Sequence, residues 1–407
     1  MKRILADDRA KLAFASAIVQ VTNFLFLLLA RIIISDEDFA IVLTQLAIAG
    51  IIGAIASLRL EVLMYQAHGC VTRSSILAPI LAIAVVIALN YAGFFLAALI
   101  WNKSPPLSPI VVPFLLGIAL SAVLNFALVQ AQRLNLLVAV RSAQCAMLTL
   151  LMAFLGTRWW TPSGSELLIA MGLSYLLPSL VLVVRFIAQV PTNNSDFPVC
   201  TIPDWVMIRR SISLTFSTGV NSIYVNLPLL AAAATQNASF ISDFGLIMRA
   251  VNAPITLIGQ VTGRLFLASA MHWSIAPERV SSALSGMVWR AMAQSLGLYL
   301  LITPVLIGVF YFYREPLNFT NLGIVPYLFL AGLGQCVINS VAQVRTPLHD
   351  ERAFLMFDSA RLLVLTIGLY GGGRMLPFEI AFGGTSLLLY TSYIPFIFLR
   401  VARYSPI

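Results

Sequence analysis

The chain has 407 residues, of which 60% are hydrophobic and 10% charged, and its mean hydropathy is +0.93. An ordinary soluble domain carries about 25% charged residues, and a disordered chain is polar and highly charged, so both classes are excluded. The composition fits a membrane protein with many spans of about 20 residues each. Twelve such spans leave short connections and tails, with no room for a soluble catalytic domain.

The formal net charge is +9. In a chain this apolar, basic residues predict membrane topology rather than nucleic-acid binding, because Lys and Arg gather on the cytoplasmic side of a membrane. The four cysteines lie far apart, and the three histidines are isolated from any second metal-ligand residue. We therefore predict no metal site, no cofactor and no nucleic-acid partner.

The predicted spans begin near the N-terminus. Residues 1–11 are basic, and the apolar run that follows is too long for the core of a signal peptide, which predicts an uncleaved first span at 12–34. Eleven more apolar runs predict spans at 39–57, 75–100, 109–130, 138–156, 165–188, 211–233, 243–265, 287–312, 323–344, 353–371 and 376–399. Counting from a cytoplasmic N-terminus places most Lys and Arg inside, which predicts a multi-pass protein with both termini cytoplasmic.

A polar stretch divides the predicted spans into two groups of six. Residues 189–210 contain several prolines and asparagines, which predicts a cytoplasmic linker. We therefore predict an N-terminal lobe at 1–188 and a C-terminal lobe at 211–407. The predicted fold class is all-α, a polytopic membrane protein with about 12 transmembrane helices in two six-helix lobes around a central cavity.

A short repeat supports two related halves. The pair Asp38-Phe39 precedes Arg59-Leu60, and the pair Asp243-Phe244 precedes Arg264-Leu265 at the same spacing. Inverted or parallel repeats of this kind are common in secondary transporters. The two matches are short, and chance alone is the alternative explanation.

Four predicted spans carry a stripe of polar residues on one helical face. The stripes are Ser16, Gln20, Asn23 and Arg31; Ser211, Thr215, Thr218, Ser222 and Asn226; Arg249, Asn252, Thr256 and Gln260; and Gln335, Asn339 and Gln343. A polar stripe that faces lipid is costly. These stripes therefore either line an interior cavity, which is the working hypothesis, or hydrogen-bond neighbouring helices.

Three arginines lie in or near predicted spans. Arg361 follows Asp358 by one helical turn, so that Asp358 either neutralises it or leaves it available for binding. Arg249 has no acidic residue one turn away, which favours a binding role; the alternative is a side chain that extends to the outer membrane interface. Arg31 lies close to Asp36, which predicts either an interfacial ion pair or a substrate contact. We find no other membrane-embedded acidic residue, so Asp358 is the candidate for ion coupling.

The basic residues are nearly all arginine. The planar guanidinium group binds phosphate through two hydrogen bonds and is less hydrated than the lysine ammonium group. An anionic substrate that carries phosphate would suit such a cavity. A bias in codon composition would give the same ratio.

Three segments resemble bacterial polysaccharide and O-antigen (Wzx-like) flippases of the multidrug/oligosaccharidyl-lipid/polysaccharide exporter superfamily. They are Arg31 with Ser35-Asp36-Glu37-Asp38-Phe39, Leu58-Arg59-Leu60-Glu61, and Phe244 to Arg249 with Pro254 and Gly259. The resemblance implies two lobes around a V-shaped cavity that the first, second, seventh and eighth helices line. It also implies an undecaprenyl-diphosphate-linked oligosaccharide as the substrate, moved from the cytoplasmic to the periplasmic leaflet by alternating access.

Under this hypothesis the candidate residues bind the substrate and no covalent bond forms or breaks. We therefore predict that the protein is not an enzyme. Arg249, Arg31 and Arg361 would attract the diphosphate or acidic sugars. Polar side chains would hydrogen-bond the sugar, namely Asn23, Gln20, Asn226, Asn252, Gln260 and Gln335. The implied partners are the lipid-linked substrate, the lipid bilayer and other polysaccharide assembly proteins.

Three other functions are compatible with a polytopic chain. A drug or cation antiporter of the same superfamily is the main alternative, and we expect it to hold cations with acidic residues in its cavity. A carrier of the major facilitator type would have a basic loop with Gly and Asp between its second and third helices, which the segment 61–74 lacks. A membrane glycosyltransferase or polymerase would need long outer loops and clustered carboxylates, and neither is found in the sequence.

Overall fold

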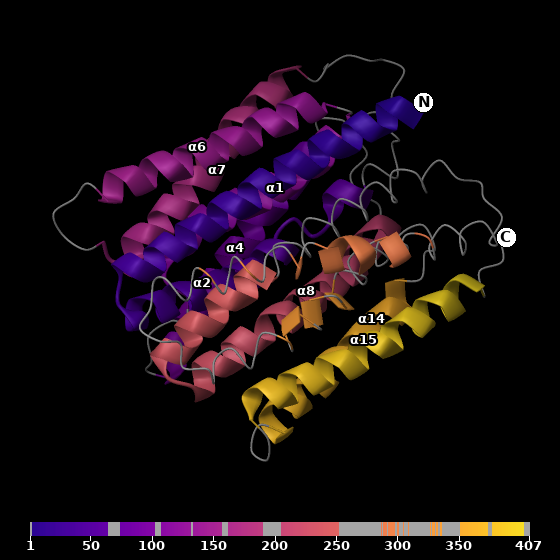
Figure 1. Cartoon of the computed structure of the whole chain (residues 1–407). Helices are drawn as coiled ribbons and strands as arrows, with labels where there is room; N and C mark the ends of the chain where they lie inside the picture. The colour runs from indigo at the N-terminus through magenta and orange to yellow at the C-terminus, as the bar shows by residue number, and fades with distance from the viewer. Residues whose placement is uncertain are drawn as a thin grey trace. The chain divides into compact units, whose positions relative to one another are not determined.

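The computed structural model describes most of the chain as helices (Figure 1). The described residues are 2–63, 74–101, 107–131, 133–156, 162–189, 205–251, 351–372 and 377–402, together with single positions between 286 and 335. No strand occurs among these residues. The predicted all-α class is therefore confirmed.

Where predicted spans fall on described residues, the observed helices overlap them, whereas most of the spans 243–265, 287–312 and 323–344 lies outside the described residues. The observed helices are α1 (Lys2–Ile33), α2 (Asp36–Ile55), α4 (Ser74–Trp101), η1 (Pro109–Val111), α5 (Val112–Gln130), α6 (Leu134–Gly156), α7 (Gly164–Gln189), α8 (Trp205–Thr235), an unlabelled helix at 238–251, α14 (Glu351–Ile367), η3 (Gly368–Gly372) and α15 (Phe378–Ala402). Within the described part of the chain, seven helices are long and apolar enough to cross a membrane.

Contacts within the chain divide it into two compact units. One unit comprises Leu25–Asn226, and the other comprises Met1–Phe24 together with Leu227–Ile407. Helices α1 and α8 each contribute residues to both units. The two predicted lobes, 1–188 and 211–407, have other boundaries than these units and stay a prediction. The predicted linker at 189–210 also stays a prediction, because most of it lies outside the described residues.

The unit Leu25–Asn226 has its tightest packing between α5 and α7. A Cβ atom added to Gly117 would lie 2.6 Å from the Cβ atom of Tyr175, and one added to Gly172 would lie 2.8 Å from the backbone nitrogen of Phe114. The rings of Phe114 and Tyr175 meet edge to face with centroids 5.7 Å apart. Small residues thus let the two backbones approach closely, as is common between membrane helices.

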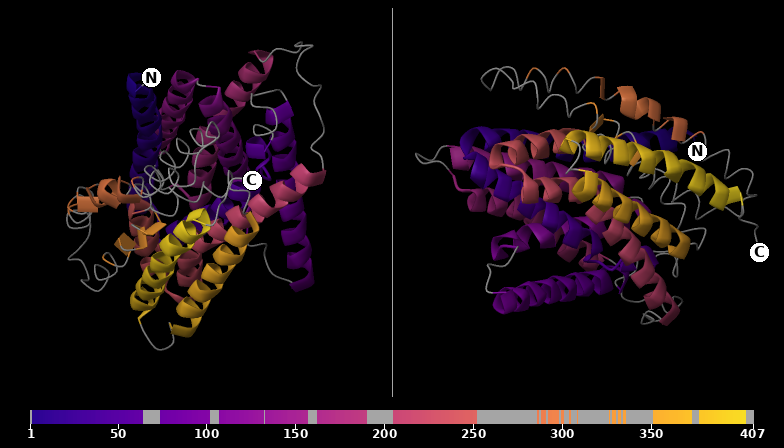
Figure 2. Two further views of the ribbon diagram at one scale, coloured as in Figure 1. Left: turned by 90° about the vertical axis from the view of Figure 1, so that its right-hand side faces the viewer. Right: turned by 90° about the horizontal axis from the view of Figure 1, so that it is seen from below.

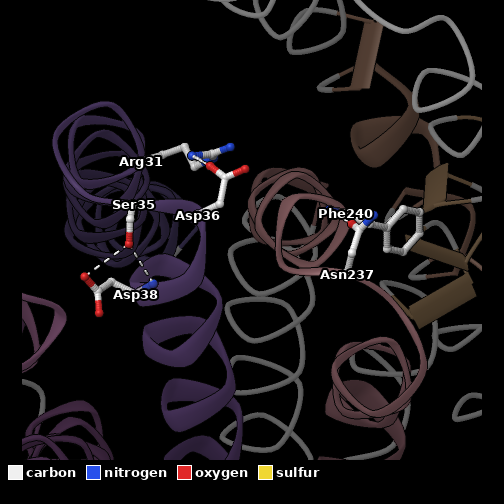
Figure 3. A network of polar contacts seen from close by, with 6 residues as sticks. All are labelled: Arg31, Ser35, Asp36, Asp38, Asn237 and Phe240. Carbon is white, nitrogen blue, oxygen red and sulfur yellow. Dashed lines mark hydrogen bonds and ion pairs between the residues drawn. The ribbon is translucent and has the colours of Figure 1, made fainter.

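Two side-chain caps fix where helices begin (Figure 3). The Ser35 hydroxyl accepts a hydrogen bond from the Asp38 backbone N–H at 3.1 Å and starts α2, and the Asn237 side chain accepts one from the Phe240 N–H at 2.8 Å and starts the helix 238–251. Ser35 precedes Asp38 by three residues, whereas Asn237 precedes Asp243 by six. The two Asp-Phe pairs of the predicted repeat are therefore out of register with the helix starts.

In the other unit, aromatic side chains join helix 238–251 to α15. The Phe244 ring meets the Phe378 ring edge to face at 5.6 Å and the Phe382 ring at 6.4 Å. Helices α14 and α15 run side by side (Figure 2). A Cβ atom on Gly368 would clash with the Thr385 side chain, so the π-helical turn η3 needs glycine at that position to approach α15.

Candidate functional site

The second helix is broken inside a segment that is apolar enough to cross a membrane. This segment runs from Asp36 to Leu63, but α2 ends at Ile55 and helical structure resumes at residue 60. Between them, Leu58 and Arg59 adopt left-handed backbone conformations with φ of 51° and 54°. Neither residue is a glycine, and this conformation is costly for a residue with a side chain.

A break within the membrane frees backbone groups that lipid cannot satisfy. The Leu58 N–H donates to the Ile55 carbonyl at 3.0 Å, and the Leu60 N–H donates to the Ser57 carbonyl at 3.2 Å. The Ser211 hydroxyl on α8 donates to the Leu58 carbonyl. Helix α8 therefore supplies a partner at the centre of the break.

Arg59 lies at the same break and reaches α8. Its Nε donates to the Thr218 hydroxyl at 3.1 Å, and its backbone N–H donates to the Ser57 hydroxyl at 3.4 Å. Its Nη1 lies 3.7 Å from Glu61 Oε1. The Arg59 side chain is 30% exposed and the Glu61 side chain 4%, so the guanidinium group spans from a buried carboxylate toward the surface.

The remaining part of the α8 stripe also contacts α2. The Ser222 hydroxyl donates to the Gly50 carbonyl at 3.3 Å, and the Asn226 amide donates to the Ser222 carbonyl at 2.9 Å. The Asn226 amide nitrogen would lie 3.8 Å from a Cβ atom on Gly50. Hydrogen bonding between helices therefore accounts for Ser211, Thr218 and Ser222, while the predicted cavity role of Asn226 stays a prediction.

Arg31 forms the interfacial ion pair that was one of its two predicted roles. Its Nη1 contacts Asp36 Oδ1 across the cap of α2 (Figure 3). Its guanidinium carbon also lies 5.9 Å from the centre of the Phe39 ring. The predicted contact of Arg31 with a substrate phosphate stays a prediction.

Arg361 and Asp358 are buried together on α14. Their side chains are 0% and 3% exposed, and Arg361 Nη2 lies 3.7 Å from Asp358 Oδ1. The guanidinium carbon lies 5.3 Å from the centre of the Tyr393 ring on α15. Of the two predicted alternatives, the structure supports neutralisation of Arg361 by Asp358.

The other predicted residues are dispersed along the chain. Gln20 and Asn23 are half-buried on α1, Arg249 is half-buried on the helix 238–251, and Gln335 is buried. These four belong to the same unit, and their roles in binding stay predictions. Asn252 and Gln260 lie outside the described residues, as do Thr256, Asn339 and Gln343.

Besides Asp358, the structure buries two acidic side chains that the sequence did not single out, and the role of Asp358 in ion coupling stays a prediction. Glu61 is 4% exposed within the apolar segment that ends at Leu63, and Asp243 is 5% exposed on the helix 238–251. The sequence placed both residues at span ends. The signal that was missed at Glu61 is the apolar run of Leu60, Val62 and Leu63 around it, which continues the span past the break.

No group of three or more His, Cys, Asp or Glu side chains could hold a metal ion among the residues that the structure describes. The break at residues 56–59 instead combines a basic group, a buried carboxylate and hydroxyl groups. Such a set can bind an anion or exchange a proton or cation.

Neither a protein-family model nor a curated protein matches this sequence. Among solved structures, the MATE multidrug transporter DinF-BH, in a ligand complex, is similar, with a TM-score of 0.68 and 14% identity over 99% of this chain and 96% of its own. An outward-facing multidrug resistance MATE family transporter of the MOP superfamily has a TM-score of 0.67 and 13% identity over 97% and 95% of the two chains.

A third similar structure is a MOP superfamily transporter from Pyrococcus furiosus, whose binding pocket is described as having reverse polarity. Its TM-score is 0.66 at 13% identity, over 97% of this chain and 95% of its own. The likeness extends over nearly the whole chain and shows that the chain has the fold of MATE transporters of the MOP superfamily. The predicted fold class is thereby confirmed.

Proposed function

We propose that the protein is an alternating-access flippase that moves an undecaprenyl-diphosphate-linked oligosaccharide from the cytoplasmic to the periplasmic leaflet. The observation that carries the proposal is Arg59, a partly exposed guanidinium group held at a helix break by Thr218 and Glu61. An arginine fixed by other groups loses less conformational freedom when it binds a phosphate. The proposed setting is a bacterial inner membrane with both termini cytoplasmic, beside other polysaccharide assembly proteins.

The arginines divide into two groups under this proposal. The side chains of Arg31 and Arg361 are only 10% and 0% exposed, and we assign them to holding the fold together. In the unit Leu25–Asn226 we assign Arg59, whose side chain is 30% exposed, to the diphosphate. In the other unit we propose separately that the half-buried Arg249 attracts the same anionic cargo. The half-buried amides of Asn23, Gln20 and Asn226 are assigned to the sugar hydroxyls.

The test measures how fast a lipid-linked oligosaccharide crosses the membrane of proteoliposomes that contain the purified protein. We expect Arg59→Gln and Arg249→Ala each to lower this rate about tenfold, because each removes a charge-assisted hydrogen bond to phosphate. Arg249→Lys keeps the charge and is expected to retain part of the rate. Arg352→Gln is the matched control, since Arg352 is exposed on α14. Equal rates in all four variants and the parent would refute the proposal.

The second candidate is a cation-coupled drug antiporter, and the buried carboxylates of Glu61 and Asp243 favour it. They remove the objection that the interior lacks acidic groups able to hold a cation or proton. The deciding measurement is efflux of a cationic dye from cells or vesicles. Dye efflux that Glu61→Gln abolishes, with no movement of the lipid-linked oligosaccharide, would establish this candidate in place of the flippase.

A further inference from the structure

A polar cluster inside the unit Leu25–Asn226 joins α5, α6 and α7 around one arginine. The hydroxyl groups of Ser121 on α5 and Ser179 on α7 are 2.8 Å apart. The Gln144 amide on α6 donates to Ser121 at 2.9 Å and to Ser179 at 3.3 Å. Its side-chain oxygen accepts a hydrogen bond from Arg141 Nη1 at 3.1 Å. Ser121, Gln144 and Ser179 are at most 5% exposed, so three helices enclose the amide that holds Arg141.

Arg141 lies on the inward face of α6. A buried stripe with three- and four-residue spacing runs along this helix and consists of Leu134, Leu137, Gln144, Leu148 and Leu155. Arg141 occupies the position between Leu137 and Gln144 in the same stripe, while exposed side chains such as Leu150 and Phe154 lie on the opposite face. Arg141 is half-buried, so part of it stays accessible although its neighbours in the stripe are enclosed.

The charge of Arg141 is not balanced by a carboxylate. Arg31, Arg59 and Arg361 each contact one, whereas the hydrogen bond of Arg141 goes to a neutral amide, and it contacts no carboxylate in the described part of the chain. Arg141 follows the start of α6 by seven residues, about 10 Å along the axis of a helix that is apolar enough to cross a membrane. Arginine stays protonated in proteins, and an unbalanced charge at this depth is costly.

The hydrogen bonds of the cluster also leave donors over. A guanidinium group only donates, so the Gln144 oxygen must face Arg141 and its amide nitrogen must face the serines. Both serine oxygens then accept from this nitrogen, and one of the two hydroxyl protons forms the bond between Ser121 and Ser179. The second hydroxyl proton and the other N–H groups of Arg141 have no acceptor among the residues that the structure describes. A surplus of donors around a positive charge calls for an anion.

The charge and the enclosure select the kind of anion. One monovalent anion balances one guanidinium group, whereas a phosphate dianion would leave a net negative charge inside the unit. Tyr175 on α7 and Cys145 on α6 lie beside the guanidinium group and are ordinarily neutral, so they contribute no second positive charge. A small ion such as chloride accepts several hydrogen bonds and brings no donors or apolar groups that would need partners of their own.

We propose that the Arg141 guanidinium group binds a small monovalent anion, with chloride as the physiological ion, on the inward face of α6. The anion accepts hydrogen bonds from N–H groups of Arg141 that Gln144 does not use. Gln144, which the two serines fix in place, is a positioning residue that orients the guanidinium group. The ion is a resident of the unit and not cargo, so the proposal does not depend on the proposed flippase activity.

The first test measures the thermal midpoint of the purified full-length protein in detergent while potassium chloride replaces potassium gluconate at constant ionic strength. Gluconate is an anion too large for an enclosed site. We expect the midpoint of the parent protein to rise by about 2–4 °C as chloride reaches about 150 mM, because the ion binds only the folded protein. Arg141→Gln should abolish this rise. Arg185→Gln is the matched control, since it removes an exposed arginine on α7, and it should keep the rise.

A second variant supplies the missing negative charge from the chain itself. Gln144→Glu keeps the size of the side chain and places a carboxylate where the amide oxygen accepts from Arg141. The two serine hydroxyl groups can then both donate to this carboxylate. We expect this variant to have the same midpoint in chloride and in gluconate. It tests the proposal even if Arg141→Gln does not fold.

The position of the ion is tested by crystallising the parent protein in bromide and locating bromide by its anomalous scattering. We expect a bromide ion in contact with the Arg141 guanidinium group. The proposal is overturned by equal midpoints of the parent protein in the two salts, by a chloride effect that persists in Arg141→Gln or Gln144→Glu, or by bromide that binds only elsewhere. Failure of oligosaccharide transport in the flippase assay would leave these measurements unaffected.

Discussion

Two arginine–carboxylate pairs in this protein have the same separation but different surroundings. In both, a guanidinium nitrogen lies 3.7 Å from a carboxylate oxygen. Arg361 and Asp358 are three residues apart on one face of the continuous helix α14, and both side chains are buried. Arg59 and Glu61 are two residues apart, and the Arg59 side chain is 30% exposed.

The difference follows from the backbone. Residues three apart on a helix are neighbours, whereas residues two apart point to different sides. The left-handed conformations at Leu58 and Arg59 break the helix and allow the second pair to form. A pair that regular helix geometry produces can be fully buried and neutral, while the pair at the break leaves a charged group at the surface, where it can meet a ligand.

The largest expected effect is at the buried pair. Asp358→Asn leaves the Arg361 charge buried without its carboxylate, which is expected to lower the free energy of unfolding by about 3–5 kcal/mol. The measurement is the thermal midpoint of the detergent-solubilised protein. The double variant Asp358→Asn with Arg361→Met should recover most of the loss, because no charge is then left buried. A single variant as stable as the parent would show that Asp358 does not neutralise Arg361.

A smaller effect is expected at the break itself. Leu58→Gly replaces a left-handed leucine by the residue that tolerates this conformation, whereas Leu60→Gly puts glycine where helical structure resumes. Both leucines are half-buried, so the lost contacts are comparable. We expect Leu60→Gly to be the less stable variant by about 1–2 kcal/mol. Equal thermal midpoints would mean that the left-handed backbone at Leu58 carries no cost.

The same contrast explains what the sequence predicted. Spans such as 109–130 and 165–188 were found within a few residues, because long apolar runs need helices in a membrane. The contact of Arg361 with Asp358 followed from helical spacing. The break could not be predicted, since Ser57-Leu58-Arg59-Leu60 contains no Gly or Pro to mark a turn, whereas the apolar residues around Glu61 did indicate its burial. We infer that this conformation depends on its contacts with α8, which is distant in the sequence.

The smallest expected effect tests this dependence on α8. Ser211→Ala removes the hydroxyl group that donates to the Leu58 carbonyl, while Ser213→Ala removes a half-buried hydroxyl group two residues farther along the same helix. We expect Ser211→Ala to lower the free energy of unfolding by about 1 kcal/mol, the usual contribution of one hydrogen bond, and Ser213→Ala to change it little. The double variant that combines Ser211→Ala with Leu58→Gly sharpens the test. If α8 stabilises the left-handed turn, removing the Ser211 hydroxyl group should lower the free energy of unfolding less in the Leu58→Gly background than in the parent, because glycine adopts the turn without this hydrogen bond. Strict additivity would instead show that the turn holds independently of Ser211, and that its cause lies within residues 56–60.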